Sequence, residues 1–236
     1  NQLSEPICVN NFNPKIISEW ITKRQRKYPI FNNAYMMTGT HHLYNYLPTK
    51  HEKWLTMIKQ EIIDSGLIID ILNAKTMEAV FRLLQGCSFL GSFLAYQYTI
   101  DMNYSPYINF SENDFVKAGI GAIRGIKKCF LCYGNKCEDA IWYVKEHFND
   151  LLKRYGYTSF HPLPGHEPTL IDLQNCFCET DKYLRAKMPE LRIGNVRIKQ
   201  KYMPHTDPIQ FFFPPKWNIV EMYKYKPIVV PTLFDL

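Results

Sequence analysis

The chain has 236 residues and a formal net charge of +6, with 28 lysine and arginine residues against 22 aspartate and glutamate residues. Aromatic residues make up 15% of the sequence, and 46% of it is hydrophobic, which is enough to bury a core. No apolar run approaches the roughly 18 residues of a membrane span, and no signal peptide is recognisable, which argues against a membrane or secreted protein. The basic balance permits a polyanionic partner such as nucleic acid.

The seven cysteines are an odd set without the spacing of a disulfide scaffold, so reduced thiols and an intracellular location are expected. That location is the nucleus for a eukaryotic protein and the cytoplasm of the infected cell for a phage protein. A Cys-x2-Cys-x4-Cys run and a Cys-x-Cys pair suggest a zinc or iron–sulfur site, formed by Cys129, Cys132, Cys137, Cys176 and Cys178. A Cys-x-Cys pair within a helix points its thiols apart, however, so free thiols, no metal and no cofactor are predicted. Because the chain begins with Asn1 rather than methionine, it is expected to be part of a larger multidomain protein.

Residues 1–30 are predicted to form an arm and one basic helix. The arm leads into a helix over Lys15–Lys27, which Pro29 stops. The helix closes with the basic run Lys23-Arg24-Gln25-Arg26-Lys27. A phosphate contact and a solvated helix end, favoured by the helix dipole, explain this run equally well.

Further helices are predicted over 50–63, 67–72 and Thr76–Gln85, and Ser88 is a suitable N-cap for a longer one. The residues of the longer helix that should face the core are Phe89, Phe93, Tyr96 and Ile100. Gln97 and Asp101 lie four residues apart and share another face. Such polar groups are costly if buried without partners. Bonds to the following loop and a functional role explain them equally well.

A helix-hairpin-helix is predicted over 111–131. Ser111 and Asp114 form a capping box for a short helix that starts near residue 112, and Gly119-Ile-Gly121 separates it from a second apolar-periodic helix. The glycines permit a tight turn, and the amides that follow form an anion site. The residues predicted to bind the DNA backbone are Gly119, Gly121, Ala122, Lys117, Arg124, Lys127 and Lys128. A tight turn with a solvated basic face is the simpler alternative.

The second half of the chain is predicted to hold two more helices and an extended tail. One helix runs from Glu138 to Tyr155, and Thr169 caps the next. The polar stripe of this last helix consists of Asp172, Asn175, Glu179 and Lys182. Spacing alone favours an amphipathic surface helix. Residues 31–188 are expected to form the helical domain, and 189–236 an extended segment, rich in proline and aromatic residues, that packs on it.

Several segments together resemble the α-glutamyl/putrescinyl-thymine pyrophosphorylase group, whose module also occurs as the helical domain of 5-hydroxymethyluracil (5-hmdU) DNA kinases. The segments are Phe93-Leu-Ala-Tyr-Gln97, Asp101-x-Asn-Tyr-Ser105, Phe110-Ser-Glu-Asn-Asp-Phe-Val116, the glycine-rich segment after Ala118, and Asp172-Leu-Gln-Asn-Cys-Phe-Cys-Glu-Thr-Asp-Lys-Tyr183. The likeness runs over roughly residues 24–185 and is specific in its last two-thirds.

The resemblance implies an all-α fold like that of DNA glycosylases and a role in thymine hypermodification. In that chemistry an amine or amino acid displaces pyrophosphate from 5-pyrophosphorylmethyluracil in DNA. The implied protein is a transferase whose partners are the DNA backbone, a flipped modified pyrimidine and a small amine donor. The implied catalytic face consists of Gln97, Asp101, Asn175, Glu179, Lys182 and Tyr183. Met36 stands where the family pattern has an arginine, which makes a binding-only descendant a credible alternative.

Two other functions stay open. The first is a non-catalytic DNA-binding module that serves a 5-hmdU DNA kinase, or a chromatin or transposon protein. These residues contain no GxxxxGK[ST] motif and do not themselves form a P-loop kinase. The second is a monofunctional DNA glycosylase, because Asp139 lies 18 residues after Gly121, near where such enzymes place their catalytic aspartate.

Overall fold

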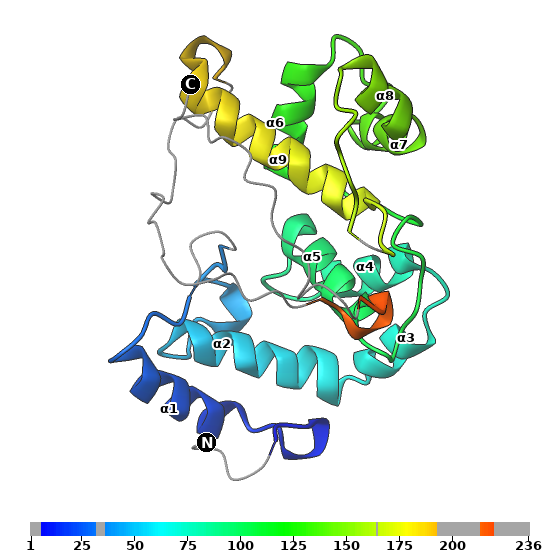
Figure 1. Ribbon diagram of the computed structural model, residues 1–236. Helices are drawn as coiled ribbons and strands as arrows, with labels where there is room; N and C mark the ends of the chain where they lie inside the picture. Colours follow the sequence, from blue (N-terminus) through cyan, green and yellow to red (C-terminus); the bar gives the residue numbers. More distant parts are fainter. Residues whose placement is uncertain (1–5, 32–35, 164, 193–212, 220–236) are drawn as a thin grey trace.

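The protein is all-helical, as the sequence predicts: the computed structural model describes residues 6–31, 36–163, 165–192 and 213–219, and these hold no strand (Figure 1). The α-helices within these ranges are α1 (Pro14–Gln25), α2 (Lys50–Met57), α3 (Leu67–Asn73), α4 (Met77–Gln85), α5 (Ser92–Asn103), α6 (Ile120–Cys129), α7 (Glu138–Glu146), α8 (Phe148–Arg154) and α9 (Leu170–Lys187). Shorter helical turns are η1 (Val9–Asn11), η2 (His42–Tyr44), η3 (Ile58–Asp64), η4 (Pro189–Leu191) and η5 (Pro215–Trp217). Among these described helices, none combines the length and the apolar character that crossing a membrane requires.

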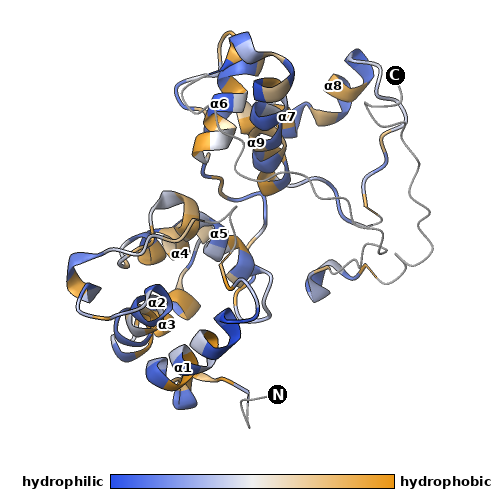
Figure 2. Ribbon diagram, turned by 90° about the vertical axis from the view of Figure 1, so that its left-hand side faces the viewer, coloured by the Kyte–Doolittle hydropathy of each residue, from blue (hydrophilic) through white to orange (hydrophobic). Residues whose placement is uncertain are grey.

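The helices gather in two halves that share one core. Figures 1 and 2 show α1 to α5 in one half and α6 to α9 in the other. Phe81 and Tyr96 of the first half belong to the same buried cluster as Ile126, Ile141 and Leu170 of the second. Each such side chain contributes about 1.5–3 kcal/mol when it is fully buried. The shared core therefore holds the two halves together.

The helix predicted over 50–63 is α2 continued by η3, a π-helical turn that carries an important carboxylate. Glu61 accepts hydrogen bonds from the Tyr44 hydroxyl at 2.6 Å and from the Ser88 amide at 2.7 Å. Ser88 is therefore held by Glu61 and does not cap α5, which was its predicted role. The chain turns at Phe89, where φ is 66°, and α5 begins only at Ser92.

The first helix of the predicted hairpin is absent, and this prediction is wrong. Residues 112–114 form a turn and 115–119 are not helical, so that α6 begins at Ile120 without a helix directly before it. Side chains from elsewhere satisfy the backbone here. Asn103 bonds both the amide and the carbonyl group of Phe110, at 2.9 and 3.1 Å, and Glu138 accepts from the Ala118 amide at 3.0 Å. Bonds of this kind replace those that a helix would supply.

The glycines of α6 bring this helix close to α9. A Cβ atom on Gly121 would lie 2.4 Å from the Cys178 sulfur, and one on Gly125 would lie 2.0 Å from the carbonyl oxygen of Phe177. At Gly125 the obstacle is backbone, so no side chain fits there, and at Gly121 the Cys178 side chain would have to shift. The Gly-x-Gly-x3-Gly pattern therefore serves helix packing, which sequence spacing alone could not distinguish from a phosphate-binding turn.

The remaining elements of the second half agree with the sequence except at one break. Thr169 and Asp172 form the predicted capping box of α9. The helix predicted from Glu138 to Tyr155 is instead two helices, α7 and α8, because the backbone leaves helical geometry at His147, with φ −106° and ψ 18°.

Part of the C-terminal tail packs on the end of α5. The Trp217 indole donates to Glu112 at 2.7 Å, and its ring lies edge-on to Tyr104. The Lys216 ammonium donates to the carbonyl oxygen of Asn103. Residues 193–212 and 220–236 of the predicted tail lie outside the described residues.

Replacing Gly125 by alanine tests the close approach of α6 and α9. The new Cβ would meet the Phe177 backbone rather than a movable side chain, so we expect a loss of about 3 kcal/mol or more in the free energy of unfolding. Gly39→Ala is the control, because its Cβ would have only ordinary contacts, the nearest at 3.7 Å with Lys50. Urea denaturation measures both. Equal stability of the two variants would contradict the packing described here.

Candidate functional site

Neighbouring protein engages two of the predicted anion-binding residues at the start of α6, Gly119 and Ala122. The Gly119 amide donates to the Gln174 side-chain oxygen at 3.0 Å. Ala122 is fully buried in the core, and Gly121 faces Cys178. A DNA phosphate therefore cannot reach the amides of Gly119 and Ala122 in this conformation. A glutamine of α9 thus engages the Gly119 amide, whereas Ile120 is 68% exposed and Gly121 is partly exposed, and phosphate binding at this turn stays a prediction.

Lys128, predicted to bind DNA, instead forms a buried ion pair. Its ammonium lies 2.6 Å from Asp181, and the side chains are 2% and 1% exposed. Arg185 lies on the other oxygen of the same carboxylate at 3.1 Å. The predicted contact of Lys128 with DNA is therefore corrected, since a buried ammonium held by a carboxylate is not available to a phosphate.

The other three side chains predicted to bind phosphate differ in how far they are exposed to solvent. Lys117 forms an ion pair with Glu138 at 2.7 Å, and its side chain stays 41% exposed. Arg124 is half-buried and Lys127 is exposed. The structure thus leaves Lys127, Arg124 and in part Lys117 as surface cations beside α6.

Four of the predicted catalytic residues come to the surface together along α9. They lie at relative positions 0, 4, 7 and 8, which share one helix face, and all four are exposed: Asn175, Glu179, Lys182 and Tyr183. Lys182 donates to Glu179 at 2.5 Å, with side chains 47% and 66% exposed. Asp172, at the start of the same stripe, belongs to the capping box. The exposed face of α9 therefore carries a carboxylate, an ammonium, an amide and a phenol.

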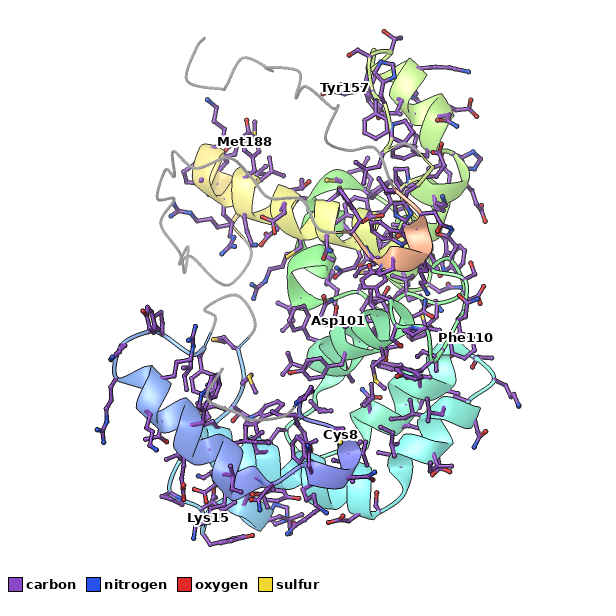
Figure 3. All side chains as sticks on the ribbon, turned by 60° about the horizontal axis from the view of Figure 1, so that its bottom comes forward. Cys8, Lys15, Asp101, Phe110, Tyr157 and Met188 are labelled. Atoms are coloured by element: carbon purple, nitrogen blue, oxygen red, sulfur yellow. The ribbon has the colours of Figure 1, made fainter. Side chains whose placement is uncertain are left out.

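The two predicted catalytic residues of α5 have different surroundings. Gln97 is buried, with 8% of its surface exposed. Asp101 reaches the surface, although neighbouring protein removes enough water to raise the pKa of its carboxyl group. In the view of Figure 3, Asp101 lies between the half that contains α6 and α9 and the half that contains α1 and α2. A raised pKa suits a group that accepts a proton during a reaction.

Gln174 and Asp181 position the site, and sequence reasoning assigned a role to neither. Gln174 accepts from the Gly119 amide and donates to Asn175 at 2.8 Å, so that it links the start of α6 to the exposed face of α9. Asp181 lies four residues after the buried Phe177. A carboxylate on the apolar side of a helix was the available signal for a buried ion pair.

A cavity of about 380 Å³ lies on a different part of the molecule, between α4, α7 and the non-helical segment before α6. Its lining residues are Glu78, Arg82, Asp114, Phe115, Val116, Lys117, Lys136, Glu138 and Trp142. Of the predicted site residues, it includes Lys117 and none of the catalytic ones.

The cysteines of the proposed metal cluster are free thiols. Within the part of the chain that the structure describes, no three histidine, cysteine, aspartate or glutamate residues are grouped so that they could hold a metal ion. Burial raises the pKa of Cys129, Cys176 and Cys178. A raised pKa reduces the share of the thiolate, which is the form that binds metals.

One comparison with known proteins gives a match. The family model described as 5-hmdU DNA kinase, helical domain, matches residues 1–193. This range contains α1 to α9, and thus the whole helical body described above. Searches of curated proteins and of solved structures give no significant match.

Replacing Asp181 by asparagine tests the buried ion pair. The change leaves the Lys128 ammonium and the Arg185 guanidinium without their carboxylate, so we expect a loss of about 3–5 kcal/mol in the free energy of unfolding. Glu179→Gln on the same helix breaks an exposed ion pair and should cost about 1 kcal/mol or less. Thermal or urea unfolding measures both. A cost for Asp181→Asn as small as that of its control would rule out the pair as a main support of α9.

The Glu138 carboxylate should make the stability depend on pH. Burial alone would raise its pKa, but hydrogen bonds from Lys117 and the Ala118 amide together outweigh burial and lower the pKa below 4.5. A carboxylate with a lowered pKa stabilises the fold above its unfolded pKa, and this contribution is lost as the pH falls through the folded pKa. The stability difference between wild type and Glu138→Gln should therefore be largest near neutral pH and shrink below about pH 4. Urea unfolding across this range measures it, and a constant difference would contradict the assignment.

Proposed function

The chain belongs to the family of the helical domain of 5-hmdU DNA kinases, and on that premise we propose that it binds DNA and modifies a 5-substituted uracil there. The reaction that we propose is the displacement of pyrophosphate from 5-pyrophosphorylmethyluracil by an amine or amino acid. This reaction is the one that the resemblance to the thymine pyrophosphorylase group implies. The proposed reaction requires neither a P-loop nor a bound metal ion.

The exposed face of α9 is the observation that carries this proposal. An amphipathic surface helix requires only polar residues on its outer side. This one combines a carboxylate and an ammonium in contact, at Glu179 and Lys182, with an amide and an aromatic ring one turn away on the same face. The carboxylate, the ammonium and the aromatic ring each match a need of the proposed reaction.

The chemistry assigns roles to the ammonium and to the carboxylates. The nitrogen of the amine attacks the exocyclic methylene carbon, and the bond from this carbon to the pyrophosphate oxygen breaks. Lys182 stabilises the departing pyrophosphate. Glu179 accepts the proton that the nitrogen loses, and Asp101, with its raised pKa, is the second candidate for this step.

The cations that remain at the surface beside α6 are proposed to bind the DNA backbone. Lys127 is exposed, and Arg124 and Lys117 are partly so. They supply sequence-independent attraction to phosphates. Tyr183, 45% exposed on α9, offers a ring on which an extruded pyrimidine can stack.

A non-catalytic DNA-binding module of a 5-hmdU DNA kinase is the second candidate. Met36 is 64% exposed, at the position where the family pattern has an arginine. The described cavity also lies away from α9. Both observations favour binding without turnover.

Substituting Glu179 by glutamine separates these two functions. The full-length chain is incubated with DNA that contains 5-pyrophosphorylmethyluracil and a mixture of amines, and the nucleosides are analysed by mass spectrometry. Because the general base is removed, we expect aminated product to fall by about 100-fold or more, while DNA affinity changes by less than about two-fold. Glu190→Gln, another exposed glutamate, is the control and should keep full turnover.

Two results would reject the catalytic assignment. Unchanged turnover in Glu179→Gln would remove this residue from the site. DNA binding without product, in the wild type and with every amine, would select the non-catalytic module. Release of a free base would instead indicate a glycosylase.

A further inference from the structure

A stripe of aromatic and basic side chains at the C-terminal end of α1 has no part in the site proposed above. Trp20, Arg24 and Tyr28 follow one another at intervals of four residues and share one face of the helix. The Tyr28 amide donates to the carbonyl oxygen of Arg24 at 3.0 Å, so helical geometry continues up to this residue. Pro29 then ends it.

Arg24 lies between the two rings of this stripe. Its guanidinium carbon is 5.9 Å from the centre of the Trp20 ring and 5.0 Å from that of Tyr28. Tyr28 is 56% exposed, and Trp20 is half-buried. A guanidinium held beside an exposed ring forms a flat, positively charged surface on which an unpaired base can stack.

The cations around this surface are available to a ligand. Residues 20–30 contain four of them and no acidic residue, and all four are exposed: Lys23, Arg24, Arg26 and Lys27. No ion pair found among the described residues includes any of them. The helix dipole favours cations at this end by only about 0.3–1 kcal/mol, and it does not account for the exposed Tyr28 beside them.

We propose that the C-terminal end of α1 binds an unpaired stretch of a DNA strand. Its phosphates lie against Lys23, Arg26 and Lys27, and a base stacks on the surface that Arg24 and Tyr28 form. The strand is unpaired because the bases of a duplex are stacked on one another and present no free face to a ring. Figure 1 shows α1 on the opposite side of the molecule from α6 and α9, so this surface is separate from the face of α9. The choice of DNA over RNA as the ligand rests on the proposed function, whereas the binding of an unpaired strand rests on the residues of α1 alone.

Charge reversal on α1 tests the proposal. The full-length chain is titrated into a labelled single-stranded oligothymidylate, and binding is measured by fluorescence anisotropy at several salt concentrations. Arg26→Glu should weaken binding at least about five-fold and reduce the slope of log K against log salt by about 0.7 for each phosphate that is no longer neutralised. Lys15→Glu is the control: this exposed lysine lies at the other end of α1, where Figure 3 labels it, and its reversal changes the net charge equally. It should leave affinity within about two-fold of wild type.

Substitution of Tyr28 tests the stacking separately from the charge. Tyr28→Ala should weaken binding about five-fold or more, whereas Tyr28→Phe keeps the ring and should keep the affinity. Far-UV circular dichroism confirms that each variant retains its helices.

Three outcomes would overturn the proposal. One is equal affinity of Arg26→Glu and Lys15→Glu. Another is duplex DNA that binds as tightly as the single strand and does not respond to Tyr28→Ala. The third is an oligouridylate that binds more tightly than the oligothymidylate, which would assign the surface to RNA. Oligothymidylate carries no reactive base, so this test does not depend on the outcome of the turnover measurement with Glu179→Gln.

Discussion

The contact between α6 and α9 is the constraint on which the site depends. One buried carboxylate, Asp181, neutralises two cations from different helices, Lys128 and Arg185. Removing three charges from water is costly, and it is offset only when the groups meet at hydrogen-bond distance. The two helices must therefore approach closely, and Gly121 and Gly125 allow this because they place no side chain between the backbones.

This contact fixes the rotation of α9 about its own axis. The face that includes Gln174, Phe177 and Asp181 is turned inward, toward α6 and the core. The residues at the opposite positions, Glu179 and Lys182 among them, are consequently turned outward. A rotation of α9 would move the buried ions out of their ion pair, which is unfavourable. The exposed constellation on α9 is thus a consequence of the ion pair behind it.

The sequence predicts the local features of this fold and misses those that depend on distant partners. Thr169 is recognisable as a cap because capping involves residues only three positions apart. The glycines at 119–125 fit a phosphate-binding hairpin and a close helix contact equally well, because both require residues without a side chain. The sequence pattern therefore predicts the hairpin without excluding the contact. What distinguishes the two is Phe177 and Cys178, more than fifty residues later. The role of Lys128 likewise depends on a carboxylate 53 residues away.

Pairing with distant residues also decides which cations are free to bind DNA phosphates. A count of charges treats Lys128 and Lys27 alike, yet a carboxylate inside the core holds the first, while the second lies exposed in a segment without acidic residues. Attraction to a polyanion depends on the cations that remain at the surface after internal pairing. In the described part of the chain, two groups of such cations lie beside α6 and at the end of α1, on opposite sides of the molecule. A DNA strand bound at both of these proposed surfaces would therefore have to extend across the molecule.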